Sequence, residues 1–323
     1  MQMGQNILNS SSMPSSFLLM ATPGLEDPYA WISIPLCLLF LTSFVGNGLV
    51  LLVISQEVRL HQPMYLFLSM LAITDLLFSL STSPSVLGVY WFNSRKVRSQ
   101  LCLFQMFLMH SLSVIESALL VAMAFDRFVA ICHPLRYTAI LTNPAVGKMG
   151  LASAIRGTLI HLPPVASLKL LPYCHGNALS HSYCLHQDVM KLACEGTNIF
   201  NITYGLAVII CTVTLDLVLI VLSYLLIIRA VLSITSETER YKSFNTCVSH
   251  LCAVFLFYVP MVALSMIHRF GIDVPPLFTS FMANLYLFAP PMLNPIIYSI
   301  KSKQIRRGFY KFFHPTRETP LNP

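Results

Sequence analysis

Three acidic side chains, Asp75, Glu116 and Asp216, lie inside long apolar stretches, where an isolated charge is costly. A charge at the centre of a bilayer costs about 2.5–3.5 kcal/mol on insertion scales, so such residues normally have polar partners within a helix bundle. If Asp75 and Glu116 are neighbours, either one carboxyl holds a proton or a cation lies between them. Carboxylate oxygens suit a hard cation such as sodium, so a sodium site and a partly protonated hydrogen-bonded cluster are both open. The sequence suggests no partner for Asp216.

An arginine near the end of an apolar stretch is a candidate anchor for a carboxylate. Tyr258, Ser265 and Arg269 are seven and four residues apart, so a helix places them within about 40° of one face. A guanidinium offers a planar fork of donors that matches the two oxygens of a carboxylate. The alternative is an ion pair between Arg269 and Asp273 in the adjacent loop, and the residues alone favour neither interpretation.

Further side chains are candidates for contact with the same small molecule. His110 lies eight residues after Cys102 and is placed to donate a hydrogen bond to a bound acid, and Gln187 follows Cys184 by three residues. A histidine satisfied within the core is the alternative for His110. Candidate apolar walls for an alkyl tail are Met106, Phe107, Val208 and Ile209. Ordinary packing explains each of these four equally well.

Helices that cross a membrane must position these side chains. The chain has 323 residues, of which 55% are hydrophobic and 10% charged, whereas soluble domains carry about 25% charged residues. A helix needs about 20 apolar residues to cross a bilayer. Seven stretches qualify, at residues 30–55, 62–90, 101–132, 147–171, 197–229, 243–268 and 275–300.

We therefore predict an all-α membrane protein with a seven-transmembrane helix bundle at residues 29–300, between an N-terminal tail at 1–28 and a C-terminal tail at 301–323. In the C-terminal tail, Ile305, Phe309 and Phe312 recur with basic residues between them. This pattern predicts a short amphipathic helix that lies on the inner surface of the membrane.

Charge predicts which way the chain is inserted. If the N-terminus is outside, 13 of the 20 lysines and arginines fall on the side of the C-terminal tail, which marks that side as cytoplasmic and the N-terminal tail as extracellular. We expect a multi-pass protein of the plasma membrane. Asn9-Ser-Ser is then an accessible glycosylation acceptor, while Asn201-Ile-Thr matches the same motif at the start of the fifth stretch.

Four cysteines fall on the predicted outer side, where disulfides persist: Cys102, Cys174, Cys184 and Cys194. Four cysteines allow three pairings, and spacing alone does not choose between them.

Short motifs occur one per stretch and in a fixed order: Gly46-Asn47, Pro63-Met-Tyr-Leu-Phe-Leu68, Asp126-Arg127-Phe128, Lys242-Ser-Phe-Asn-Thr-Cys-Val-Ser-His250 and Asn294-Pro-Ile-Ile-Tyr298. Together they resemble the rhodopsin-like G-protein-coupled receptors and, within them, the odorant receptors. The loop from Cys174 to Cys194, together with His268-Arg269-Phe270, is similar to class I, fish-like odorant receptors. Phe128 departs from the tyrosine that is usual in the family.

The resemblance implies roles for several residues. It implies disulfides between Cys102 and Cys184 and between Cys174 and Cys194. It also implies that Asp126 holds Arg127 in a latch that opens for a G protein. The partners of the released arginine would be Tyr224, His250 and Tyr298. Taken alone, Arg127 fits equally well an interfacial arginine that reaches toward lipid headgroups.

We predict an odorant receptor that binds a small carboxylic acid in the outer half of the bundle and activates a heterotrimeric G protein of the stimulatory, olfactory type. Many class I receptors respond to small organic acids. A receptor of the same fold for a non-odorant metabolite or lipid is the first alternative, and a channel or transporter is the second. No nucleophile–base pair indicates an enzyme, and we expect no cofactor beyond the sodium ion and no nucleic-acid partner.

Overall fold

The computed structural model of the chain describes residues 12–20, 30–270 and 274–313. Two predicted sites lie outside this description: the glycosylation acceptor Asn9, and the side chain of Arg269, whose backbone alone is described. The helices also contain residues of which the structure describes the backbone alone: 30–33, 239, 242, 246, 268, 270, 276–277, 301 and 313.

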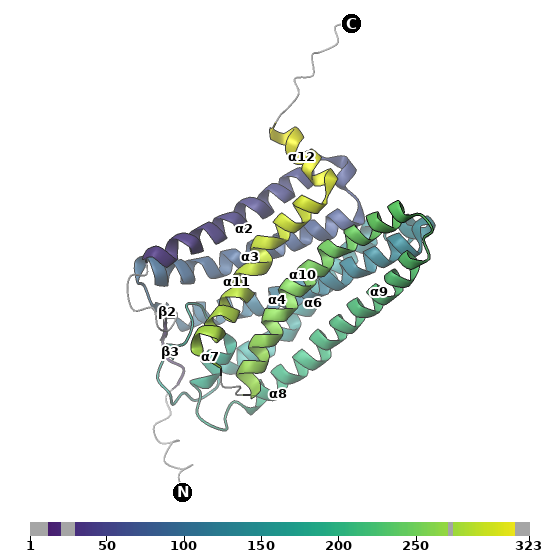
Figure 1. Cartoon of the computed structure of the whole chain (residues 1–323). Helices are drawn as coiled ribbons and strands as arrows, with labels where there is room; N and C mark the ends of the chain where they lie inside the picture. Colours follow the sequence, from purple (N-terminus) through teal and green to yellow (C-terminus); the bar gives the residue numbers. More distant parts are fainter. Residues whose placement is uncertain (1–11, 21–29, 271–273, 314–323) are drawn as a thin grey trace.

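Among the described residues, seven long helical segments run side by side (Figure 1). They are α2 (Ala30–Gln56), α3 (Pro63–Phe92), α4 (Ser99–Cys132), α6 (Asn143–Leu168), a segment that runs from α8 (Ile199–Val208) through the π-helical η3 (Ile209–Thr214) into α9 (Leu215–Leu232), α10 (Glu237–Phe270) and α11 (Pro276–Lys301). The shorter helices are η1 (Val58–Leu60), η2 (Pro134–Arg136), α5 (Tyr137–Ile140), α7 (His186–Lys191) and α12 (Lys303–Phe313).

Within the described part of the chain, four helical segments are long and apolar enough to cross a membrane: Ile34–Gln56, Pro63–Phe92, Ile199–Leu232 and Ser243–Ile267. Large apolar side chains lie exposed along them, as in Leu41 at 57% and Val218 at 55%. Lipid tails match such surfaces, whereas water does not. The other long helices contain more polar residues, such as Arg156 and His161 in α6.

A proline in α11 explains why α2 packs closely against it. Pro295 has no N–H, so the carbonyl of Pro291 loses its partner within the helix. The Asn47 side-chain amide donates to that carbonyl over 2.8 Å. Gly46 leaves room for the approach, because a Cβ there would lie 3.0 Å from Cγ of Pro295. The motif residues Gly46, Asn47 and Pro295 therefore form one helix–helix contact.

Another glycine brings α4 and α6 together. A Cβ on Gly157 would lie 2.5 Å from the carbonyl oxygen of Ser111, which is closer than any real Cβ contact. The absence of a side chain at this position lets the two backbones approach. As a result, the histidine one turn after Gly157 in α6, His161, lies beside His110 of α4.

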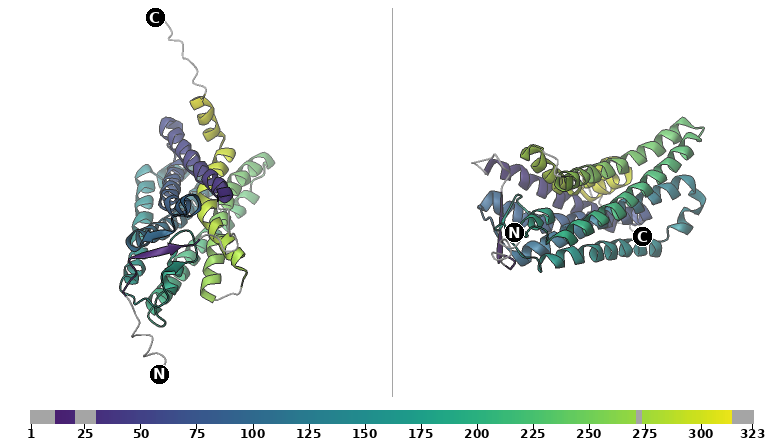
Figure 2. Two further views of the ribbon diagram at one scale, coloured as in Figure 1. Left: turned by 90° about the vertical axis from the view of Figure 1, so that its left-hand side faces the viewer. Right: turned by 90° about the horizontal axis from the view of Figure 1, so that it is seen from below.

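A small sheet covers one end of the bundle, and α12 lies at the opposite end (Figures 1 and 2). We call these the sheet end and the α12 end. Strand β1 (Ser16–Leu19) pairs antiparallel with β2 (Lys96–Arg98) and parallel with β3 (Ala178–Leu179). Phe17 in β1 is fully buried, whereas Leu18 is 39% exposed. Residues 16–19 are thus part of the folded structure, although four residues are too few for alternation to predict a strand.

The α12 helix is held against α2. Ile305 is fully buried, and Lys311 forms an ion pair with Glu57 over 2.6 Å. Tyr65 of α3 donates a hydrogen bond to Gln304. Lys303, Arg306 and Arg307 are not among these contacts and lie on the exposed side of α12.

Phe17→Ala should lower the melting temperature of the purified protein, because removing a fully buried phenylalanine costs about 3–5 kcal/mol. Leu18→Ala, on the exposed side of the same strand, is the matched control and should leave the melting temperature nearly unchanged. Equal effects of the two substitutions would mean that β1 does not pack as described.

Candidate ligand-binding cavity

An internal cavity lies within the half of the bundle nearer the sheet end. Its volume is about 120 Å³, and a cavity needs roughly 10–15 Å³ to hold a single water molecule. One wall is polar and comes largely from α4, with His110, Ser113 and Ser117. The lining from α8, η3 and α10 is largely apolar and includes Val208, Ile209, Val213, Met261 and Leu264. The space suits a small organic molecule with an apolar body.

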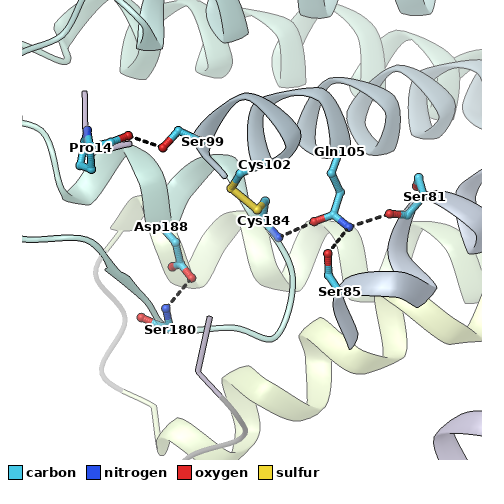
Figure 3. The surroundings of a disulfide bond; sticks show 9 residues. All are labelled: Pro14, Ser81, Ser85, Ser99, Cys102, Gln105, Ser180, Cys184 and Asp188. Atoms are coloured by element: carbon cyan, nitrogen blue, oxygen red, sulfur yellow. Dashed lines mark hydrogen bonds between the residues drawn. A yellow bond between two sulfur atoms is a disulfide. The ribbon is translucent and has the colours of Figure 1, made fainter. Parts of the chain in front are cut away.

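The loop after α6 closes the cavity, and a disulfide holds the loop in place (Figure 3). Cys102 of α4 is bonded to Cys184. One turn further along α4, the Gln105 side-chain oxygen accepts from the backbone N–H of Cys184 over 3.0 Å. The amide of Gln105 donates to the Ser81 carbonyl and the Ser85 hydroxyl, which ties the same point to α3. Leu185 and Gln187 follow immediately and line the cavity.

Other bonds within the loop keep its shape. Cys174 is bonded to Cys194, the second pairing that the resemblance implies. Asp188 accepts from the backbone of Ser180 over 3.0 Å, and the same carboxylate oxygen forms a hydrogen bond with Nδ1 of His181 over 2.5 Å. Burial raises the pKa of Tyr173 to about 12, so its phenol stays neutral and donates to the carbonyl of Leu168.

Histidines gather beside the cavity. The ring centroid of His110 lies 5.5 Å from that of His161 and 6.0 Å from that of His186. Nδ1 of His110 is buried and has no hydrogen-bond partner among the described residues. His161 lines the cavity, and our sequence analysis missed it. Its position inside an apolar stretch, like that of Asp75, was the available signal.

A chain of polar contacts lies under the cavity. The Ser117 hydroxyl, which lines the cavity, donates to the Asp216 carboxylate over 2.6 Å and contacts the Tyr258 hydroxyl at 2.7 Å. Arg156 binds both carboxylate oxygens of Asp216, each at 2.9 Å. These four side chains come from α4, α6, α9 and α10. We call them the floor network, and it supplies the partners that the sequence did not suggest for Asp216.

The predicted ligand contacts divide into two groups. His110, Gln187, Val208, Ile209 and Ser265 line the cavity. The described lining does not include Tyr258, Met106 or Phe107. Tyr258 reaches the cavity only through Ser117, Met106 is fully buried in the surrounding core, and Phe107 packs against that core.

The two predicted cation ligands share an amide donor. The side-chain nitrogen of Asn294 lies 3.1 Å from Asp75 and 3.3 Å from Glu116. The second oxygen of Asp75 is buried without a hydrogen-bond partner among the described residues. Asp75 and Glu116 are therefore neighbours that share the amide of Asn294. Among the described residues, no group of three or more His, Cys, Asp or Glu side chains is arranged to hold a metal ion.

At the α12 end, Arg127 is held by its neighbour. Its guanidinium donates twice to one oxygen of Asp126, at 2.7 and 3.1 Å. Tyr137 donates to the other carboxylate oxygen over 2.8 Å. Burial, together with this carboxylate, raises the pKa of Tyr137, so its phenol remains a donor.

The other predicted coupling residues lie in the same half of the bundle. The Tyr224 hydroxyl lies 2.8 Å from Nδ1 of His250, and the other ring nitrogen of His250 lies 3.0 Å from the carbonyl of Leu120. The Tyr298 hydroxyl is buried and has no hydrogen-bond partner in the described part of the chain.

Comparison with known proteins now identifies the family. The family model described as olfactory receptor matches residues 36–315. The chain belongs to the olfactory receptor family. It is 54% identical to olfactory receptor 51G2 of Homo sapiens over 298 residues, which cover 92% of this chain and 95% of that receptor. It is 50% identical to olfactory receptor 51G1 of the same species over 307 residues, or 95% of each chain.

Olfactory receptor 51E1 of Homo sapiens is 49% identical over 305 residues, or 94% of this chain and 95% of that receptor. Receptors of group 51 are class I olfactory receptors, so this receptor is placed in class I, as the loop motifs indicate. Members of the family are multi-pass proteins of the plasma membrane that bind small-molecule odorants and couple to G proteins. They are receptors and not enzymes.

Arg156→Met should destabilise the receptor by about 3–5 kcal/mol, because it leaves the carboxylate of Asp216 buried without its charge partner. The double variant Arg156→Met with Asp216→Leu removes both charges and should recover most of the loss. Denaturation of the purified variants measures both effects. A double variant that is no more stable than the single one would contradict the pairing.

Proposed function

We propose that this receptor binds a small carboxylic acid in the cavity and that Arg269 anchors the carboxylate. The proposal is supported by the helical register of α10, which relates Arg269 to Ser265. Ser265 lines the cavity, and α10 continues as a helix to Phe270. Arg269 lies four residues after Ser265, so the helix turns it to nearly the same face, one turn nearer the sheet end.

The cavity suits the rest of such a ligand. Buried polar atoms of His110 and Gln187 have no hydrogen-bond partner among the described residues, and a polar ligand end would supply one. An alkyl tail would lie against Val208 and Ile209, which form part of the apolar wall. The acid is therefore bound by charge and hydrogen bonds at one end and by apolar burial along its length.

We further propose that the chain crosses the membrane seven times with the sheet end outside. The two disulfides at the sheet end support this orientation, because disulfides persist on the outer side of the membrane. The excess of basic residues on the other side supports it independently. In this orientation α12 lies at the inner surface, where its apolar side meets α2 and lipid.

Activation then follows because the acid binds the active receptor more tightly than the resting receptor. The acid draws the outer part of α10 toward the cavity, and the inner part of α10 moves away from α4. That movement frees Arg127 from Asp126, and Tyr224, His250 and Tyr298 become its partners while a stimulatory, olfactory-type G protein enters. Shifting a receptor from about 1% to 99% active needs about 5.5 kcal/mol of differential affinity. A desolvated carboxylate–arginine pair is of the right size, since losing one partner costs about 3–5 kcal/mol.

We also propose that Asp75 and Glu116 bind a sodium ion that stabilises the resting receptor. The close approach of both carboxylates to Asn294 supports this proposal. An ion between them would relieve the repulsion of two buried carboxylates and provide a partner for the second oxygen of Asp75.

Arg269→Ala should raise the EC50 for short carboxylic acids by about 100-fold or more, because it removes the charge partner of the carboxylate. Arg269→Lys keeps the charge but loses the fork and should give an intermediate EC50. Cyclic-AMP dose–response curves, with surface expression measured in parallel, test both variants. An unchanged dose response in Arg269→Ala would remove this residue from the mechanism.

Arg127→Ala should abolish ligand-stimulated cyclic AMP while ligand still binds, because the residue acts at the α12 end and not at the cavity. Binding of a radiolabelled acid to membranes and cyclic-AMP output are measured on the same cells. Normal cyclic-AMP output would refute the latch.

Sodium should raise the melting temperature of the unliganded receptor, compared with choline at the same ionic strength, because the ion offsets the repulsion between Asp75 and Glu116. Asp75→Asn removes one of the two charges and should abolish the difference between the two salts. Melting curves that are the same in both salts would count against the site.

A further inference from the structure

The polar wall of the cavity extends well below its outer end. His110, Ser113 and Ser117 all line the cavity and follow one another at intervals of three and four residues on α4. A helix places such residues on one face, and seven residues span about 10 Å. The described lining from η3 and α10 includes Ile209, Met261 and Leu264; its polar residues, Thr212 and Ser265, come from different helices and form no such row. A plain fatty acid would lay an apolar tail along these polar groups.

The hydroxyl of Ser117 has a definite hydrogen-bonding capacity. Its hydrogen is donated to Asp216 over 2.6 Å, so in the 2.7 Å contact with Tyr258 the phenol must be the donor. A hydroxyl oxygen has two lone pairs, and Tyr258 uses one of them. Ser117 therefore offers the cavity an acceptor and no donor.

The middle of the row has spare capacity too. The hydroxyls of Ser113 and Tyr286 lie 2.5 Å apart, and both residues line the cavity. Two hydroxyls carry two hydrogens, and their mutual contact uses one, so the pair can donate as well as accept. Ser117, at the inner end of the row, is therefore the hydroxyl that requires the ligand to be a hydrogen-bond donor.

We propose that the preferred ligand is a short hydroxy acid, with its carboxylate toward Arg269 and a hydroxyl at the inner end that donates a hydrogen bond to Ser117. The carboxylate end rests on the function proposed above, whereas the hydroxyl end rests on the floor network alone. A second carboxylate does not fit the inner end, because it is an acceptor facing an acceptor and lies beside Asp216.

The hydroxyl would also reach the helices that move. Ser117 connects directly to Tyr258 of α10 and, through Asp216, to Arg156 of α6. A ligand that donates to Ser117 joins this chain of contacts and changes the strength of its bonds, since hydrogen bonds in a chain polarise one another. The inner end of the ligand therefore bears on α10 from below, as the carboxylate does from above.

The test uses three carboxylic acids of equal chain length that end in a methyl, a methoxy or a hydroxyl group, applied over a series of lengths. At the best length, the hydroxy acid should have an EC50 about 3- to 10-fold below that of the other two, the range expected for one hydrogen bond. The methoxy acid is the matched control, because its oxygen accepts but cannot donate.

Ser117→Ala should remove the advantage of the hydroxy acid. Tyr258→Phe, which leaves the Ser117 acceptor in place, should keep the advantage of the hydroxy acid in binding affinity, although it removes the contact between Ser117 and α10. A hydroxy acid no more potent than the methyl-ended acid at any length would overturn the proposal, and so would an advantage that persists in Ser117→Ala. If Ser117→Ala fails to reach the surface, the comparison of hydroxyl with methoxy on the unmodified receptor still decides.

The outcomes separate this inference from the proposed function. If plain acids activate the receptor and a hydroxyl adds nothing, the hydroxy-acid proposal fails and the acid anchor stands. If neutral alcohols activate in a Ser117-dependent way and acids do not, the acid anchor fails and the donor site at Ser117 stands.

Discussion

Every polar group inside an apolar helix bundle must find its partner within the bundle, and this constraint organises the receptor. Asn47 takes the carbonyl that Pro295 leaves free, and Arg156 takes both oxygens of Asp216. Because lipid offers no hydrogen bonds, such contacts cannot be exchanged for water as they can on a soluble surface. Among the described residues, Nδ1 of His110 is buried beside the cavity without a partner, and in the proposed function the ligand supplies one.

The cavity lies between two fixed structures. Above it, the bond between Cys102 and Cys184 and the contacts of Gln105 hold the loop against α3 and α4. Below it, the floor network joins four helices through Ser117 and Asp216. A molecule in the cavity touches both, so its binding energy can be divided between the loop end and the floor. In the proposed function, this division lets a small ligand influence the far end of α10.

Much of this arrangement could be predicted from single residues and their spacing. The cost of buried charge indicates that Asp75 and Glu116 need polar partners, and three of the expected cavity residues, His110, Gln187 and Ser265, follow from helical spacing and from their sequence distance to Cys102 and Cys184. The pairing of Arg156 with Asp216 could not be predicted, because the residues are 60 positions apart and no local period relates them. Tyr258 and Met106 lie beyond the cavity wall because small rotations of a helix decide which neighbour faces inward. The strand at residues 16–19 is too short for its alternation to be recognised.

The account depends most on the cavity itself being the binding site. Val208 lines it, so a cysteine placed there by Val208→Cys can be modified with a bulky thiol reagent that fills the space. The direct measurement is the dissociation constant of a short carboxylic acid for this purified variant before and after modification, with the unmodified sequence treated in the same way to account for native cysteines. Filling the cavity should abolish binding in the variant and spare it in the control. Equal affinity before and after modification would contradict it.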